Sequence, residues 1–262
     1  MRLHRIKAIL LQEYFITRRS LEVIMDLFFF SIISVIVFGF ISAFLAGSAS
    51  AATAQSLLLG MILWEIIRIT QYSMSVGALW NIWSRNLSNM FIAPLSLAEY
   101  MLAHMLSGTA KALLAFAGMW LIASYIFGFN ILSLGPVNLT LFFANLTLFS
   151  WSTGIIILGV IFRYGTRIQA LAWGLIFLFQ PLTAAFFPVS VLPPALQTIA
   201  YLFPPTYVFE AARAALINPS VDWGMAGLAL AENIVYFALS LQLFSFMFRK
   251  SKQTGQFARN EG

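Results

Sequence analysis

Four ionisable side chains lie near the middle of long apolar stretches, where an unpaired charge is costly: Glu65, Arg68, Lys111 and Glu232. A charge that faces lipid costs about 3 kcal/mol, so we expect these side chains to face the protein interior or a wet cavity. In one interpretation they form a single polar cluster that lines a path for a sugar or phosphate headgroup. In the other they form structural ion bridges, with Glu65 paired to Arg68 at i,i+3. Lys111 would then pair with Glu232 across two helices.

The motifs of several enzyme classes are missing from the sequence. It contains no H-E-x-x-H, no G-x-S-x-G and no G-x-x-x-x-G-K-[ST] loop that could wrap nucleotide phosphates. The chain therefore cannot hydrolyse ATP by itself, and an ATPase would have to be another polypeptide. His104 has no second ligand at metal spacing, so we expect a packed or interfacial histidine and no metal site. The chain has no cysteine, which excludes a thiolate nucleophile, and cysteine usage therefore gives no indication of the redox compartment.

The composition predicts that a membrane surrounds most of the chain. Of its 262 residues, 61% are hydrophobic and 9% are charged. A helix of roughly 20 apolar residues spans a bilayer, and six stretches are long enough. They are 24–45, 56–80, 100–127, 137–162, 168–187 and 225–248. We expect the first to stay in the mature protein, because it lacks the features of a cleaved signal peptide. Asp26, near its start, is expected to be an interfacial residue.

The basic residues predict the orientation of these spans. Twelve Lys and Arg residues fall in the N-terminal segment, the loops after the second and fourth spans, and the C-terminal tail, whereas the other side carries only Arg213. By the positive-inside rule both termini are cytoplasmic. The net charge of +6 does not indicate nucleic-acid binding, because the basic residues lie at the ends of apolar runs and form no stripe.

Two short segments on the basic side are amphipathic. Residues 1–20 place one apolar face at helical spacing, which predicts a helix on the inner leaflet, with a disordered basic tail as the alternative; its members are Leu3, Ile6, Leu10 and Tyr14. Residues 81–95 predict a second interfacial helix that Pro94 ends, with a simple membrane anchor as the alternative. Its apolar face comprises Trp83, Leu87, Met90 and Phe91, and its polar face Arg85, Ser88 and Asn89.

The segment between the fifth and sixth spans is apolar and rich in proline. Its two helix-like stretches are too short to cross a bilayer, and Pro194 and Pro205 can each begin a helix because the first turn needs no N–H from them. Asn218 and Pro219 end the second helix. We therefore expect residues 188–217 to form two re-entrant helices in the outer leaflet, with an ordinary surface loop as the alternative.

This order of elements resembles the permease subunits of ABC-type exporters. The resemblance rests on "WSRNL" and "APLS" in the loop after the second span and on "FFPVSVLPPALQTIAYLFPPTYVFEAARAAL" near the outer face. It covers nearly the whole chain in topology and is sharpest over residues 181–217. The most similar group moves drugs, lipids, teichoic acids, O-antigen chains and lipo-oligosaccharides outward. Many relatives have an acidic residue and a Gly-Thr pair early in the loop, where this chain has "SRNL" at 84–87.

The resemblance implies specific roles for residues of two segments. The loop helix 81–95 would be the coupling helix that seats in a groove of the ATPase subunit, through Trp83, Arg85, Asn86, Leu87, Asn89, Met90 and Pro94. The outer helices would form a gate that includes Pro188, Pro193, Pro194, Pro204, Pro205, Glu210 and Arg213. Glu210 and Arg213 are spaced to pair with each other at i,i+3.

The sequence and the resemblance together predict an all-α polytopic membrane protein with six transmembrane helices, forming a single permease domain over residues 1–262. Implied partners are two copies of an ABC ATP-binding subunit, which hold ATP and Mg, a second copy of this chain in a homodimer, and membrane lipid. No cofactor on this chain and no nucleic acid are expected. The expected location is the bacterial plasma (inner) membrane. An intramembrane enzyme and a passive channel stay open as alternatives, and the substrate is not named.

Overall fold

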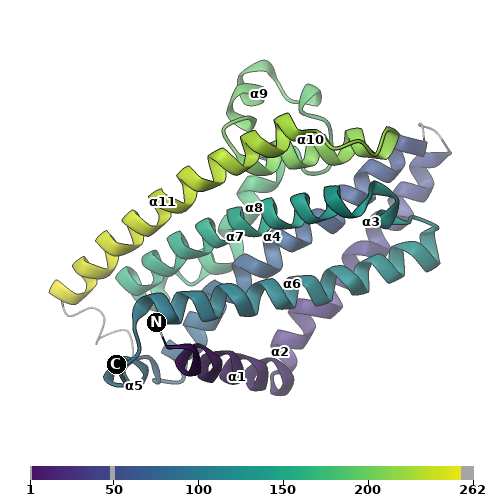
Figure 1. Ribbon diagram of the computed structural model, residues 1–262. Helices are drawn as coiled ribbons and strands as arrows, with labels where there is room; N and C mark the ends of the chain where they lie inside the picture. Colours follow the sequence, from purple (N-terminus) through teal and green to yellow (C-terminus); the bar gives the residue numbers. More distant parts are fainter. Residues whose placement is uncertain (1, 48–50, 255–262) are drawn as a thin grey trace.

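The computed structural model describes residues 2–47 and 51–254, and this part of the chain is helical, without strands. Five long apolar helical segments form a bundle (Figure 1). The first is a continuous run over Leu21–Ala46, in which α2 (Leu21–Ile24), a π-helical turn η1 (Met25–Phe29) and α3 (Phe30–Ala46) follow one another. The others are α4 (Ala51–Trp83), α6 (Leu97–Phe127), α7 (Pro136–Tyr164) and α11 (Trp223–Gln253).

Helix α4 is the centre of the bundle and packs against α3, α6 and α7, while α11 packs against α7. Its middle turns are buried nearly all round, which is typical of a span shielded from lipid by other helices. A glycine allows α6 to lie close to α4. A Cβ at Gly108 of α6 would lie 2.9 Å from the backbone oxygen of Thr70 on α4, so only glycine fits there.

A total of six spans is not confirmed, because the fifth predicted stretch, 168–187, does not form one long helix. Its helix α8 (Ala170–Leu182) has 13 residues and is therefore about 20 Å long, short of the roughly 30 Å hydrocarbon core. Pro181 lies in its last turn, and Ala184 takes φ 52°, which ends the helix. In place of one span, the chain forms α8, a turn and then the shorter helices that lead to α10 (Pro204–Ile217) (Figure 1). Apolar composition alone does not reveal such a break.

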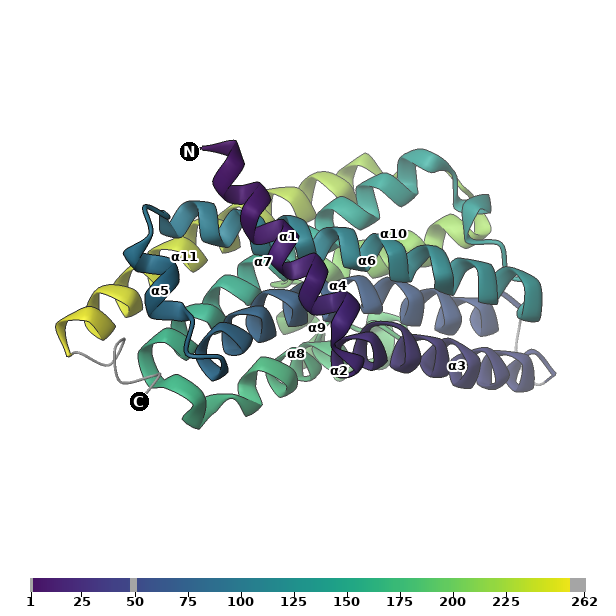
Figure 2. The ribbon, with the colours of Figure 1, turned by 90° about the horizontal axis from the view of Figure 1, so that it is seen from below.

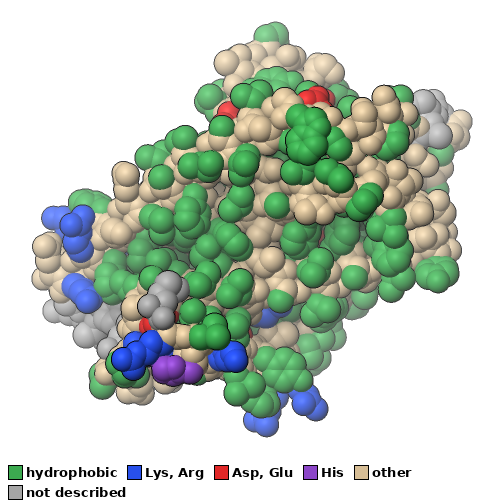
Figure 3. All heavy atoms as spheres, viewed as in Figure 1, with side chains coloured by type: hydrophobic (Ala, Val, Ile, Leu, Met, Phe, Trp, Pro, Cys, Tyr) green, Lys and Arg blue, Asp and Glu red, His purple; other side chains and the backbone are tan. Residues whose placement is uncertain are grey.

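The N-terminal end of α1, the C-terminal end of α11 and the short helix α5 (Leu87–Ile92) lie at the same end of the bundle (Figures 1 and 2). On the face seen in Figure 3, Lys and Arg side chains gather at and near this end, and the far end shows none. We call it the basic end. Its assignment to the cytoplasm is the prediction of the positive-inside rule.

The predicted N-terminal helix is present as α1 (Leu3–Arg19), which crosses α6 obliquely (Figure 2). The side that packs on the bundle consists of Ile6, Ile9 and Glu13, so Ile6 is the one buried member of the predicted apolar face; that this face lies on the inner leaflet stays a prediction. Leu3 and Tyr14 are 68% and 55% exposed and point away from the bundle. The helix is turned in this way because Glu13 has buried polar partners on α4 and α6, described below.

The outer segment forms a short 3-10 turn η4 (Val189–Val191), α9 (Pro194–Ala200) and α10 (Pro204–Ile217). Helix α9 begins at Pro194 as predicted. Helix α10 begins one residue before the predicted Pro205, with Pro204 and Pro205 both in its first turn. It ends before Asn218, also as predicted. That these helices are re-entrant in the outer leaflet stays a prediction.

Candidate functional site

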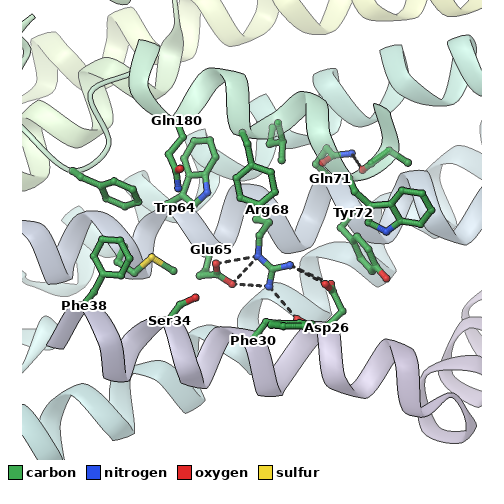
Figure 4. A pocket seen from close by; sticks show the side chains of 16 residues that line it. Asp26, Phe30, Ser34, Phe38, Trp64, Glu65, Arg68, Gln71, Tyr72 and Gln180 are labelled. Atoms are coloured by element: carbon green, nitrogen blue, oxygen red, sulfur yellow. Dashed lines mark hydrogen bonds and ion pairs between the residues drawn. The ribbon is translucent and has the colours of Figure 1, made fainter. Parts of the chain in front are cut away.

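The predicted pair of Glu65 and Arg68 is confirmed and lies at a cavity between α3, α4 and α8 (Figure 4). The cavity has a volume of about 360 Å³. Arg68 Nη2 is 2.8 Å from Glu65 Oε2, and Ser31 Oγ donates to the same oxygen at 2.7 Å. Arg68 points from α4 toward the N-terminal end of α3, and the hydrogen bonds of Ser31 with Glu65 and Arg68 join the two helices.

A third charged side chain, Asp26, completes this cluster. Arg68 Nη1 is 3.2 Å from Asp26 Oδ2, and Arg68 Nη2 donates to the Asp26 carbonyl oxygen at 3.0 Å. The sequence predicted an interfacial role for Asp26 and missed this contact. The available signal was its position at the start of the first apolar stretch, where a carboxylate needs a partner. Asp26, Glu65 and Arg68 are called the arginine cluster below.

The predicted bridge between Lys111 and Glu232 is not formed. Lys111 Nζ on α6 donates instead to Glu13 Oε2 on α1 at 2.8 Å and to Ser73 Oγ on α4 at 3.1 Å. Glu232 lies on α11 beside Tyr207 of α10. The four predicted charges therefore occupy three separate places, and they do not form the single cluster that the sequence suggested. Whether any of them lines a path stays a prediction.

Glu13 is the buried acidic group that sequence reasoning missed. Its side chain is 3% exposed, and Ser107 Oγ donates to it at 3.4 Å in addition to Lys111. Burial raises the pKa of Glu13, but the interactions with His104 and Lys111 outweigh it and hold this pKa below its ordinary value. The carboxyl is thus ionised at neutral pH. Its spacing from Ile6 and Ile9, at i+7 and i+4, was the signal that could have placed it on the buried face.

His104 is a packed side chain, as expected. Its ring meets that of Tyr100 at 4.5 Å between centroids, and its Nδ1 lies 3.7 Å from Glu13 Oε1. Among the described residues, no group of three or more His, Cys, Asp or Glu side chains could hold a metal ion.

The predicted loop helix 81–95 is shorter than expected. Helix α4 continues to Trp83, Arg85 turns the chain with φ 53°, and α5 then spans Leu87–Ile92. The turn is held by the backbone N–H of Asn86, which donates to the backbone carbonyl oxygen of Asn81 at 2.9 Å. Trp83 therefore ends α4, where its ring stacks on that of Trp173 of α8 with 6.3 Å between centroids.

The remaining implied coupling residues surround α5. Arg85, Asn89 and Pro94 are exposed, while Met90 is half-buried against the core of the basic end. The side chain of Leu87 lies outside the described part of the structure. A groove of about 390 Å³ runs between α1 and residues 90–95, and its α1 side carries Arg2 and Arg5.

A hydrogen-bonded junction connects this loop to three helices. Gln12 of α1 donates to Asn81 Oδ1 of α4 at 2.9 Å, and Asn81 Nδ2 donates to the Tyr100 hydroxyl of α6 at 3.1 Å. Glu99 forms a capping box with Ser96 at the start of α6 and also accepts the Arg2 backbone N–H at 2.7 Å. A displacement of the loop would therefore move α1, α4 and α6 together.

The implied gate residues are tied to each other near the far end of α8. Arg213 Nη2 is 2.7 Å from Glu210 Oε1, which confirms the predicted pair. The same carboxylate oxygen accepts the Val189 N–H at 2.8 Å, so α10 holds the residues that follow Pro188. This turn rests on α4, because a Cβ at Gly60 would overlap the carbonyl oxygen of Ala185.

The chain matches a family model over residues 4–217, from α1 to the end of α10, and the model is that of the ABC-2 type transporter. The match covers well over half of the chain. The chain belongs to the ABC-2 type transporter family. Proteins of this family are the membrane permeases of ABC exporters, so the resemblance inferred from the sequence is confirmed at that level. A comparison with curated proteins finds no match for this ABC-2 permease.

Proposed function

We propose that this ABC-2 permease moves a lipid-linked saccharide, a lipid or a hydrophobic drug outward, driven by ATP that a separate subunit hydrolyses. The family match supports the role of permease. The observation that carries the coupling is the junction around Asn81, which links the exposed turn before α5 to α1 and α6. An ATP-binding subunit that pushes on α5 would thereby act on α4, which lines the cavity.

The coupling surface is the exposed part of this turn together with the groove beside α1. Arg85 and Asn89 project from it, and Ile92 is 83% exposed, which is a large apolar exposure for a residue at a polar end. Arg2 and Arg5 make one wall of the groove positive, so a docking surface with acidic residues complements it. ATP and Mg belong to that partner subunit.

The outer gate consists of α9, α10 and the turn 185–191. Both helices are too short to cross the bilayer, and Glu210 ties α10 to that turn. Outward release of the substrate requires the turn 185–191, which Glu210 connects to α10, to move away from α4. A homodimer of the permease with two ATP-binding subunits is the economical assembly, because a large substrate needs more helices around it than one chain provides. The membrane is the bacterial plasma membrane, with both termini in the cytoplasm.

The test is whether transport needs ATP hydrolysis on a partner. The full chain is purified from its own cells with any bound ATP-binding subunit, and both are reconstituted into vesicles. We expect ATP hydrolysis that requires the permease, and substrate movement that stops when hydrolysis is blocked by vanadate. Movement down a gradient without ATP would instead support a passive channel, and conversion of a lipid without net movement would support an intramembrane enzyme.

A further inference from the structure

The cavity beside the arginine cluster has walls of an unusual composition. Aromatic side chains reach it from all three surrounding helices: Phe30 and Phe38 of α3, Trp64 and Tyr72 of α4, Trp173 and Phe177 of α8. The faces of such rings carry partial negative charge and attract cations. An apolar wall of this kind inside a membrane protein also accepts hydrophobic groups of a ligand.

The cavity has more acidic than basic side chains in its lining. Glu65 and Asp26 supply two carboxylates against the single guanidinium of Arg68, which leaves one excess negative charge. The residues of α3 and α8 include no charged side chain, and α4 carries only Glu65 and Arg68. Glu22, on the preceding helix α2, is a further acidic side chain near Asp26. No other element that lines the cavity offsets this excess in the described part of the chain.

Arg68 is already engaged by the two carboxylates of the arginine cluster. A guanidinium has five N–H groups. Nε donates to Glu65, Nη1 lies 3.2 Å from Asp26 Oδ2 and 3.3 Å from Asp26 Oδ1, and Nη2 reaches Glu65, Ser31 and the Asp26 carbonyl oxygen. A phosphate that approached Arg68 would compete with the two carboxylates that already hold the guanidinium.

Two buried polar atoms of the same wall lack partners among the described residues: Trp64 Nε1, a donor, and Gln71 Oε1, an acceptor. Both side chains are 1% exposed. The Gln71 amide is fixed by its other atom, since Nε2 donates to Ser75 Oγ at 2.7 Å and to the Ala172 oxygen at 3.1 Å. A buried polar group without a partner is costly, and both residues line the cavity, so a ligand that reaches either atom would lower that cost.

We propose that this cavity is a substrate site for amphipathic organic cations. The aromatic rings contact the apolar part of the ligand and its cationic group, and the excess carboxylate neutralises that cation. Gln71 Oε1 accepts a hydrogen bond from an ammonium group where the ligand has one. Trp64 Nε1 donates to a hydroxyl or ether oxygen of the ligand. The inference rests on the proposed export function and selects the drug among its three substrate classes. It excludes phosphate-linked lipids from this site, because the carboxylates would repel them in a low dielectric.

The test uses two probes of the same shape and opposite charge, tetraphenylphosphonium and tetraphenylborate, and a neutral saccharide amphiphile, octyl glucoside. The full chain is placed in nanodiscs of phosphatidylcholine, and saturable binding is measured by equilibrium dialysis against empty nanodiscs. We expect the phosphonium to bind at least about tenfold more tightly than the borate, equivalent to ~1.4 kcal/mol.

The variant Asp26→Asn removes the excess charge and leaves the Glu65–Arg68 pair. It should weaken phosphonium binding roughly tenfold and narrow the difference from the borate. Glu232→Gln removes a carboxylate that does not line the cavity, so it is the matched control and should leave binding unchanged. If Asp26→Asn fails to fold, Trp173→Ala tests the aromatic wall and should also weaken phosphonium binding.

Equal binding of the two ions, saturation by octyl glucoside alone, or phosphonium binding that neither variant changes would overturn the proposal. The first result would mean that charge does not select the ligand, and the second would identify a neutral saccharide site. Because the assay contains no ATP, these failures leave ATP-driven export intact. Conversely, the absence of an ATP-binding partner would refute the proposed function even if the cation selectivity held.

Discussion

The buried contact between Lys111 and Glu13 gives the most quantitative prediction. Replacement of Lys111 by Met removes the cation and leaves the Glu13 carboxylate, 3% exposed, with Ser107 at 3.4 Å as its remaining close side-chain donor. Breaking a buried ion pair on one side typically costs about 3–5 kcal/mol, because the other charge stays buried and uncompensated. The lysine is itself 13% exposed, so we expect the lower part of that range for Lys111→Met.

The double variant Lys111→Met, Glu13→Gln should be more stable than Lys111→Met alone, because it removes the stranded charge. We expect a coupling energy of about 2 kcal/mol or more in a double-mutant cycle. The assay is the thermal or denaturant unfolding of the purified chain in one detergent, with helix content as the signal. The control cycle pairs Lys111→Met with Glu232→Gln, and it should be additive because Glu232 lies elsewhere. Additivity for Lys111 with Glu13, or coupling with Glu232, would refute this account of the charges.

The other predictions concern the outer turn, the coupling loop and the gate. Gly60→Ala should destabilise the chain by about 1–3 kcal/mol, because its Cβ would overlap the Ala185 oxygen, whereas an alanine at the open Gly174 should not; equal unfolding midpoints would contradict this. Arg85→Gly relieves a positive φ and should raise stability by a few tenths of a kcal/mol to about 1 kcal/mol while weakening the ATP-binding subunit's affinity; unchanged affinity would remove Arg85 from the coupling surface. A cysteine at Asn218 should react with an impermeant thiol reagent from outside, and one at Val208, 3% exposed, should be protected at rest. Labelling at 218 only from the cytoplasmic side would refute the gate.

Local sequence signals explain the ends of several helices. Pro136 begins α7, Pro194 begins α9, and Asn218 follows the end of α10, each for a reason that acts within one turn of backbone. Ser96 and Glu99 start α6 through a capping box, three residues before the predicted span.

The misses arise where distant parts of the chain decide the outcome. Lys111 could pair with any acidic group at a similar depth, and only the path of α1 over α6 brings Glu13 to it. Asp26 meets Arg68 because α3 lies against α4, which no local spacing encodes. The length of α8 depends on the turn at Ala184, which packs over Gly60 of another helix. Long-range packing, in each case, selected among locally acceptable alternatives.

The central claim is that α5 couples this permease to an ATP-binding subunit, and the most direct test substitutes its apolar positions. Leu87→Asp with Met90→Asp should leave the chain inserted but abolish co-purification of the subunit and permease-dependent ATP hydrolysis, because unpaired carboxylates resist burial in a docking groove. Leu132→Asp, an exposed apolar position at the opposite end of the bundle, is the matched control and should retain both. Retention of the subunit and of ATP-driven transport by the α5 double variant would contradict the account.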